Sequence, residues 1–119
     1  MESESERLVR SASAFRDANN RIRGSALRLR FADDQRVPFV CECSDAHCMA
    51  TVMLTLATYA MIREDPRRFV LIVGHENLAY ESIVDDRGQH GYLVVEKFGI
   101  AGDEAAQLAA NSARRHRGA

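Results

Sequence analysis

The sequence predicts a small α+β domain, and three observations lead to this class. The first 30 residues repeat small and apolar side chains at helical spacing, whereas the middle of the chain alternates short extended runs with turn residues. Residues 103–113 are rich in alanine, which is typical of a helix. With 119 residues and 46% hydrophobic content, the chain can form one core but not two separate ones.

An amphipathic N-terminal helix is predicted within residues 1–32, starting at Ser3 or Ser5 and extending for about 20 residues or more. One face carries a stripe at alternating spacings of four and three: Leu8, Ala12, Phe15, Asn19, Ile22 and Ala26. Because this stripe is thin, it is typical of a helix–helix seam. Three uses of it remain open: packing within its own domain, self-association, and binding of a foreign protein.

The predicted α+β core spans residues 33–100 and begins with a hairpin-like corner. Two extended runs, 37–41 and 51–54, are separated by the turn-forming pair Ser44-Asp45. Pro38 cannot donate to a sheet ladder, so we expect the first run at a sheet edge.

A short internal helix follows this corner. Thr55 is a good N-cap for residues 56–64, and Pro66 disfavours helical geometry at the residue before it. The expected buried face consists of Leu56, Tyr59 and Ile62. Residues 69–73 form the most apolar run of the chain and are predicted to be a central strand.

A second hairpin is expected within residues 80–98, with its turn in 85–91 and its clearer strand at 92–98. Residues 101–119 should add a C-terminal helix, at 103–113, and a frayed basic tail. The expected architecture is therefore a small antiparallel sheet with a long N-terminal helix, one short internal helix and a C-terminal helix.

The three cysteines of the chain, Cys41, Cys43 and Cys48, fall within eight residues. In an extended strand residues i and i+2 point to the same face, so Cys41 and Cys43 can bring their sulfurs together, and the turn can return Cys48. Such thiols could be ordinary buried side chains, but the polar neighbours Glu42 and Asp45 are not typical of a core strand. The cluster predicts a zinc site that staples the sheet.

Zinc prefers four ligands, so a fourth must come from elsewhere. His75 is well placed, directly after the apolar strand and Gly74. The competing possibilities are His47, His90, a carboxylate or a water molecule, and His75 could also be a solvated histidine without a ligand role.

The number of protein ligands decides the role of the metal. Four would leave no position for a substrate, which makes the zinc structural. An open site of three cysteines could activate water with Glu76 or Glu42 as a base, but the zinc-protease pattern H-E-x-x-H, the zinc-deaminase pattern and the glycine-rich phosphate loop are absent from the sequence. We therefore expect a protein that is not an enzyme.

Several segments resemble a group of short proteins from high-GC bacteria. The similarity covers roughly residues 37–98 and rests on the segments FVCEC, DPRRFV, GHE and YLVVEK together with Cys48. It implies that the three cysteines and His75 form one unit, and it implies no activity.

Charge separates along the chain. The first 30 residues carry seven arginines against four acidic side chains, whereas residues 31–113 carry thirteen acidic against six basic ones. An acidic body favours a protein partner over nucleic acid, although the arginine-rich helix could still contact phosphate. No run approaches the roughly 20 apolar residues of a membrane span. Free thiols and the lack of a signal-peptide pattern predict a cytoplasmic location.

These observations predict a regulatory or protein-interaction module with a structural zinc ion, in transcription or stress control. The N-terminal helix would supply the seam for a partner or for self-association. Two alternatives are a zinc-thiolate switch that responds to oxidants and nucleic-acid binding through the arginine-rich helix.

Overall fold

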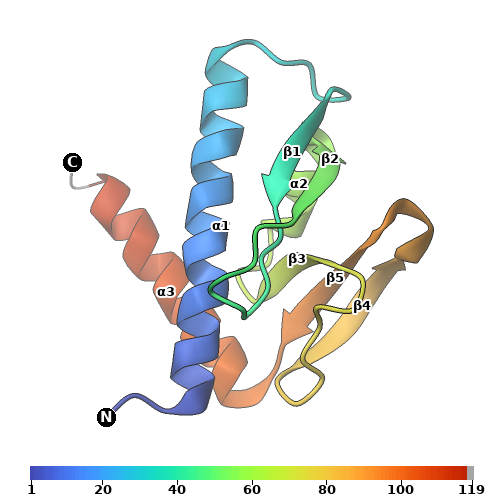
Figure 1. Cartoon of the computed structure of the whole chain (residues 1–119). Coiled ribbons are helices and arrows are strands. Elements are labelled where there is room, and N and C mark those ends of the chain that lie inside the picture. Colours follow the sequence, from blue (N-terminus) through green and yellow to red (C-terminus); the bar gives the residue numbers. More distant parts are fainter. Residues whose placement is uncertain (118–119) are drawn as a thin grey trace.

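The computed structural model describes residues 1–117 of the chain and confirms the α+β class. Figure 1 shows a long helix and a second, crossing helix on one side of the molecule and the strands on the other. The elements are α1 (Glu4–Arg28), β1 (Arg36–Val40), β2 (Thr51–Thr55), α2 (Leu56–Ile62), β3 (Arg68–Ile72), β4 (Glu81–Arg87), the 3-10 turn η1 (Gly88–His90), β5 (Tyr92–Lys97) and α3 (Gly99–Arg117).

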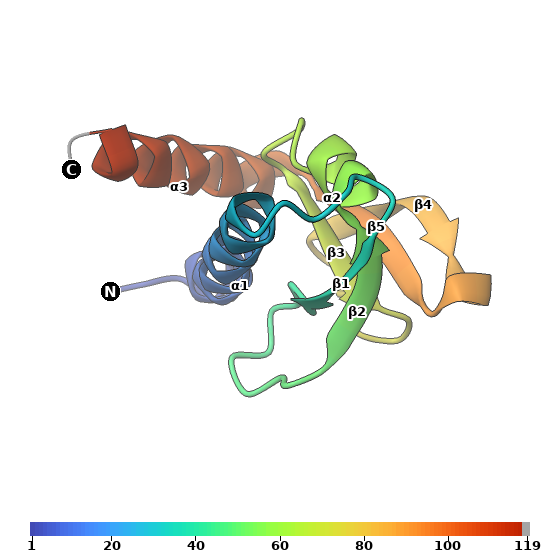
Figure 2. The same cartoon turned by 90° about the horizontal axis from the view of Figure 1, so that it is seen from above.

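The strands form two antiparallel sheets rather than one. The first is the hairpin β1-β2, and the second has the order β3-β5-β4 (Figure 2). The prediction that residues 69–73 form a central strand was therefore wrong, because β5 lies in the middle and β3 at an edge. Phe69, Val70 and Leu71 are nevertheless buried, since the other edge of β3 is covered by the cysteine segment described below.

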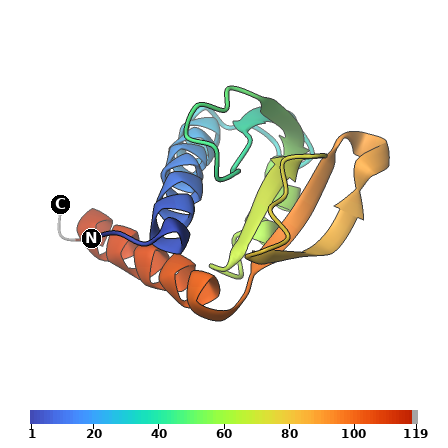
Figure 3. The same ribbon diagram turned by 60° about the horizontal axis from the view of Figure 1, so that its bottom comes forward.

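Helix α1 begins where the sequence predicts, because the Ser3 side chain accepts a hydrogen bond from the Glu6 N–H. Its predicted stripe is occupied within the domain: Ala12, Asn19 and Ala26 are buried, and α1 contacts α3 and β1. Figure 3 shows α3 crossing α1 towards the N-terminal end of that helix. Of the three open uses of the stripe, packing within the domain is the one that the structure contains.

Helix α2 has the expected cap and buried face. The Thr55 side chain accepts a hydrogen bond from the Thr58 N–H, and Leu56, Tyr59 and Ile62 are buried. Helix α3 starts at Gly99, four residues earlier than predicted, because the chain turns at Gly99 with φ +57° directly after β5. The expected fraying at 114–119 is not seen in residues 114–117, whose backbone is helical, and the remaining two residues lie outside the described part.

Candidate metal centre

The structure brings the four predicted ligands together. The sulfurs of Cys41, Cys43 and Cys48 and a ring nitrogen of His75 all lie within 4.8 Å of one another, so this group could hold a metal ion. Cys41 and Cys43 follow β1, Cys48 follows the turn, and His75 follows β3. His47 and His90 are not part of the group.

Two of the spacings between the ligand atoms agree with those of tetrahedral zinc. His75 Nδ1 lies 3.5 Å from Cys41 Sγ and 3.6 Å from Cys48 Sγ. With Zn–S near 2.3 Å and Zn–N near 2.05 Å, a tetrahedron requires sulfur and nitrogen to be about 3.6 Å apart. The donor set of three thiolates and one imidazole is one that zinc prefers in structural sites.

A turn at Asp45 and the backbone conformation of Gly74 position two of these residues, Cys48 and His75. Asp45 starts a turn that brings Cys48 back to the site. The Asp45 side chain accepts a hydrogen bond from the His47 N–H at 2.9 Å, and the Asp45 carbonyl accepts one from the Cys48 N–H at 3.0 Å. Gly74 has φ +95°, a left-handed conformation that few other residues adopt. It allows the chain to reverse after β3 so that His75 faces the cysteines.

The surroundings of the three thiols shift their pKa values in different directions. A hydrogen bond from Cys41 lowers the pKa of Cys43 to about 5, and the same bond, together with burial, raises the pKa of Cys41. Burial also raises the pKa of Cys48. Cys43 is therefore the thiol that loses its proton most readily, and coordination of zinc by all three sulfurs would require the other two to be deprotonated as well.

Glu42 lies between two candidate ligands but points to the opposite face of the extended segment. Its side chain is fully buried and accepts hydrogen bonds from Tyr59 Oη at 2.6 Å and from Arg63 Nη2 at 3.3 Å. The Val70 N–H donates to it at 3.0 Å and Asn19 Nδ2 at 2.9 Å. Glu42 therefore cannot serve as the base for a metal-bound water, as one reading of the sequence allowed.

Glu42 and Cys41 also form hydrogen bonds with the backbone groups on the edge of β3 that is not paired with β5. The Glu42 N–H donates to the Val70 carbonyl at 2.8 Å, and the Ile72 N–H donates to Cys41 Sγ at 3.3 Å. The segment that contains Cys41 and Glu42 thus takes the place of a further strand. An N–H donor to a zinc-bound thiolate is a typical outer-shell contact, because it stabilises the negative sulfur.

Asn19 performs the same role for the edge of β1. Its side-chain amide accepts from the Val40 N–H and donates to the Val40 carbonyl, both at 2.8 Å. The sequence gave a hint of this, since Asn19 is the polar member of an otherwise small and apolar stripe. Its partner could not be inferred, because the two residues are 21 positions apart.

A second set of buried charges lies around Phe69. Lys97 Nζ and Glu81 Oε2 are 2.7 Å apart, and both side chains are only 2% exposed. The cationic groups of Lys97, Arg16 and Arg63 lie 5.1, 4.8 and 5.6 Å from the centre of the Phe69 ring. Burial, followed by the nearby Arg63 charge, lowers the pKa of Arg16.

No family model, curated protein or solved structure matches the chain. Among residues 1–117, none of the helices combines the length and the apolar character that crossing a bilayer requires. The functional argument therefore rests on the geometry of the site and its surroundings.

Proposed function

We propose that the chain is a non-enzymatic module in which a structural zinc ion organises a surface for a protein partner. The observation that carries this proposal is the closed ligand set: four protein atoms from two separate segments lie within 4.8 Å of one another. Such a set leaves no coordination position for a substrate. Two carboxylates near the cysteines are also engaged elsewhere, since Glu42 is buried and Glu76 accepts from the Gly74 N–H at 2.8 Å.

The two loops that would share the zinc ion carry exposed apolar side chains. Met49 follows Cys48 and is 93% exposed, while Val73 and Leu78 flank His75 and are 48% and 63% exposed. Large apolar side chains in contact with water favour association with another protein. We assign the partner to this surface rather than to the stripe on α1, which is used inside the domain. Regulation of transcription or of a stress response, in a reducing cytoplasm, is one setting that suits such a module.

Metal content and partner capture test the two halves of this proposal. Protein purified without added zinc should contain about one zinc ion per chain, and His75→Ala should reduce this content, whereas His47→Ala should not. An affinity pull-down from the native cell should then recover a protein with the wild type but not with Met49→Glu or Leu78→Glu. Ile100→Glu, at an exposed apolar position on α3, is the matched control. Zinc-free native protein, or equal recovery by all variants, would contradict the proposal.

The partial exposure of Cys48 favours a second candidate, a switch that responds to oxidants. Two thiolates would transfer two electrons to a peroxide, which is reduced to water, and the resulting disulfide would release zinc. Mild peroxide should then liberate zinc from the folded protein, as measured with a chromogenic chelator. Release that occurs only after denaturation would rule out the switch. Nucleic-acid binding has weaker support, because residues 31–113 are acidic, although Arg7, Arg10, Arg21 and Arg28 of α1 are exposed.

A further inference from the structure

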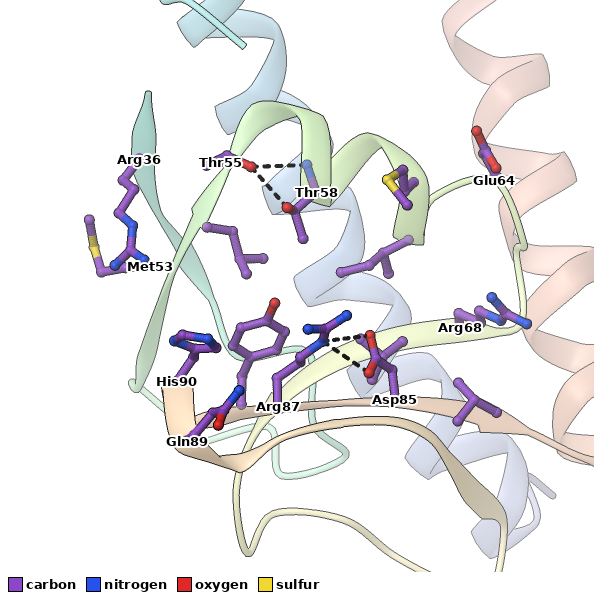
Figure 4. A pocket seen from close by; sticks show the side chains of 16 residues that line it. Arg36, Met53, Thr55, Thr58, Glu64, Arg68, Asp85, Arg87, Gln89 and His90 are labelled. Atoms are coloured by element: carbon purple, nitrogen blue, oxygen red, sulfur yellow. Dashed lines mark hydrogen bonds and ion pairs between the residues drawn. The ribbon is translucent and has the colours of Figure 1, made fainter. Parts of the chain in front are cut away.

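A groove of about 930 Å³ is lined by residues of both sheets, of α2 and of η1. It lies between β2 and α2 on one side and β4, η1 and β5 on the other. Figure 4 shows Arg36 from β1, Arg87 from β4 and His90 from η1 directed into this space, with Thr55 and Thr58 above them. Its volume is within the range of small-molecule sites, about 300–1,000 Å³.

The groove contains hydrogen-bond donors without a protein acceptor. Tyr92 lines it, is only 9% exposed, and its hydroxyl has no hydrogen-bond partner among residues 1–117. The Thr58 hydroxyl accepts from Thr55 Oγ1 at 2.9 Å, so its own proton remains free to donate. These hydroxyl groups can donate to a ligand or to water in the groove.

The charges of the groove differ from those of the acidic body around it. Three arginines line it against two carboxylates, Glu64 and Asp85. Arg87 pairs with Asp85 at 3.0 Å and Arg68 with Glu96 at 3.1 Å, whereas Arg36 has no carboxylate within 4.0 Å in the described chain. A free guanidinium in a partly enclosed space attracts anions.

The same groove has an apolar wall. Met53, Met61 and Val84 line it and are 48%, 67% and 42% exposed, and the buried side chains of Leu54, Ile62 and Val94 complete it. An anion alone would leave this wall in contact with water. A ligand with both an anionic and an apolar part would cover the wall and bind the donors.

We propose that this groove binds a small organic phosphate. Arg36, His90, Tyr92 and Thr58 offer donors from several sides of the groove, and the three terminal oxygens of a phosphate monoester accept from more directions than the planar oxygen pair of a carboxylate. The organic part lies against the methionines. This site is separate from the metal centre and goes beyond the proposed function.

Amide chemical shifts of the zinc-loaded full chain test the proposal with three probes: phenyl phosphate, inorganic phosphate and a short oligothymidylate. Phenyl phosphate should produce saturable shifts at Arg36, Thr58, Arg87 and Tyr92, and inorganic phosphate should bind the same residues several-fold more weakly. The oligothymidylate should bind more weakly than phenyl phosphate. Absence of saturable shifts in the groove with both phosphates would overturn the proposal, as would tighter binding of the oligothymidylate through α1.

Two variants and a matched control complete the experiment. Arg36→Ala should weaken phenyl phosphate binding roughly 10-fold, and Tyr92→Phe, which keeps the ring, roughly 5-fold, because each removes one hydrogen bond to a charged ligand. Arg21→Ala removes an exposed arginine of α1 outside the groove and should leave the affinity unchanged. Equal affinity in Arg36→Ala, or an equal loss in Arg21→Ala, would show that binding is not at this site.

Discussion

At the scale of single residues, the segment Cys41-Glu42-Cys43 faces two environments at once. Its sulfurs meet His75, while the carboxylate between them accepts hydrogen bonds from α1, α2 and β3. Burial of such a charge is tolerated only when its lone pairs are occupied, and here four donors occupy them. Burial and the Glu42 charge raise the pKa of Tyr59, which keeps its hydroxyl protonated and able to donate.

Replacement of Glu42 by Gln should destabilise the zinc-loaded protein by about 3–5 kcal/mol. The amide nitrogen of Gln is a donor, and it would face the hydrogen-bond donors from which one carboxylate oxygen of Glu42 accepts. Chemical denaturation measures the effect. Glu64→Gln changes an exposed carboxylate of the same type and should stay within about 0.5 kcal/mol of the wild type. Equal losses in the two variants would mean that the buried contacts of Glu42 are unimportant.

Lys97→Met should also be costly, by about 3–5 kcal/mol, since it leaves the Glu81 carboxylate buried without its cation. The methionine keeps the length of the side chain above Phe69, so lost packing contributes little. Adding Glu81→Gln should restore part of the stability, because the amide is neutral. A double-mutant cycle in urea checks this, and simple additivity of the two changes would contradict a buried ion pair.

The grouping of the three cysteines with His75 was predictable at this scale, whereas the surroundings of these residues were not. Three cysteines in eight residues and a histidine after a glycine are local signals. The contacts of Glu42 join residues 17 to 28 positions away, and those of Arg16 reach the Pro66 and Ala105 carbonyls. One signal was available: in an extended C-x-C segment the middle side chain points to the face opposite the two cysteines, which places Glu42 toward the core.

At the scale of elements, the caps were predictable and the strand order was not. Ser3 and Thr55 act on their own helices, so local sequence determines them. The order β3-β5-β4 depends on pairings between distant segments, and the apolar content of residues 69–71 indicates burial without indicating which neighbours provide it. Side chains of Glu42 and Cys41 cover the edge of β3, which no strand periodicity reveals.

The junction of β5 and α3 leaves no space at Gly102. A Cβ added there would lie 2.6 Å from the Lys97 carbonyl oxygen, whereas at Gly24 in α1 it would meet only Arg28 Nη1, at 3.4 Å. Gly102→Ala should therefore destabilise the protein by about 1–3 kcal/mol. Gly24→Ala should stabilise it by about 0.5–1 kcal/mol through helix propensity. Thermal unfolding of the two variants measures the effects. A shift of Tm in the same direction for both would contradict the close contact between Gly102 and the Lys97 carbonyl.

At the scale of the whole molecule, a metal ion bound by the candidate centre would join the loop between the two strands of the first sheet to the end of β3 in the second. A chelator should lower Tm, because a ligand bound only to the folded state stabilises it by about 4 kcal/mol at a concentration 1,000-fold above Kd. Acidification should have the same effect, since protons compete with zinc for three thiolates and the imidazole, so affinity falls as pH falls. A Tm unaffected by chelation would exclude a structural metal.

The hydrogen bond between Tyr59 and Glu42 also gives the protein an optical signal of its own. The chain has three tyrosines and no tryptophan, so its near-ultraviolet emission comes from tyrosine alone. A phenol that donates to a carboxylate at 2.6 Å is strongly quenched, and this carboxylate lies between two of the cysteines, in the segment that follows β1. Release of the cysteine loop would free Tyr59, and emission would increase. The occupancy of the metal centre can thus be followed by fluorescence without an added label.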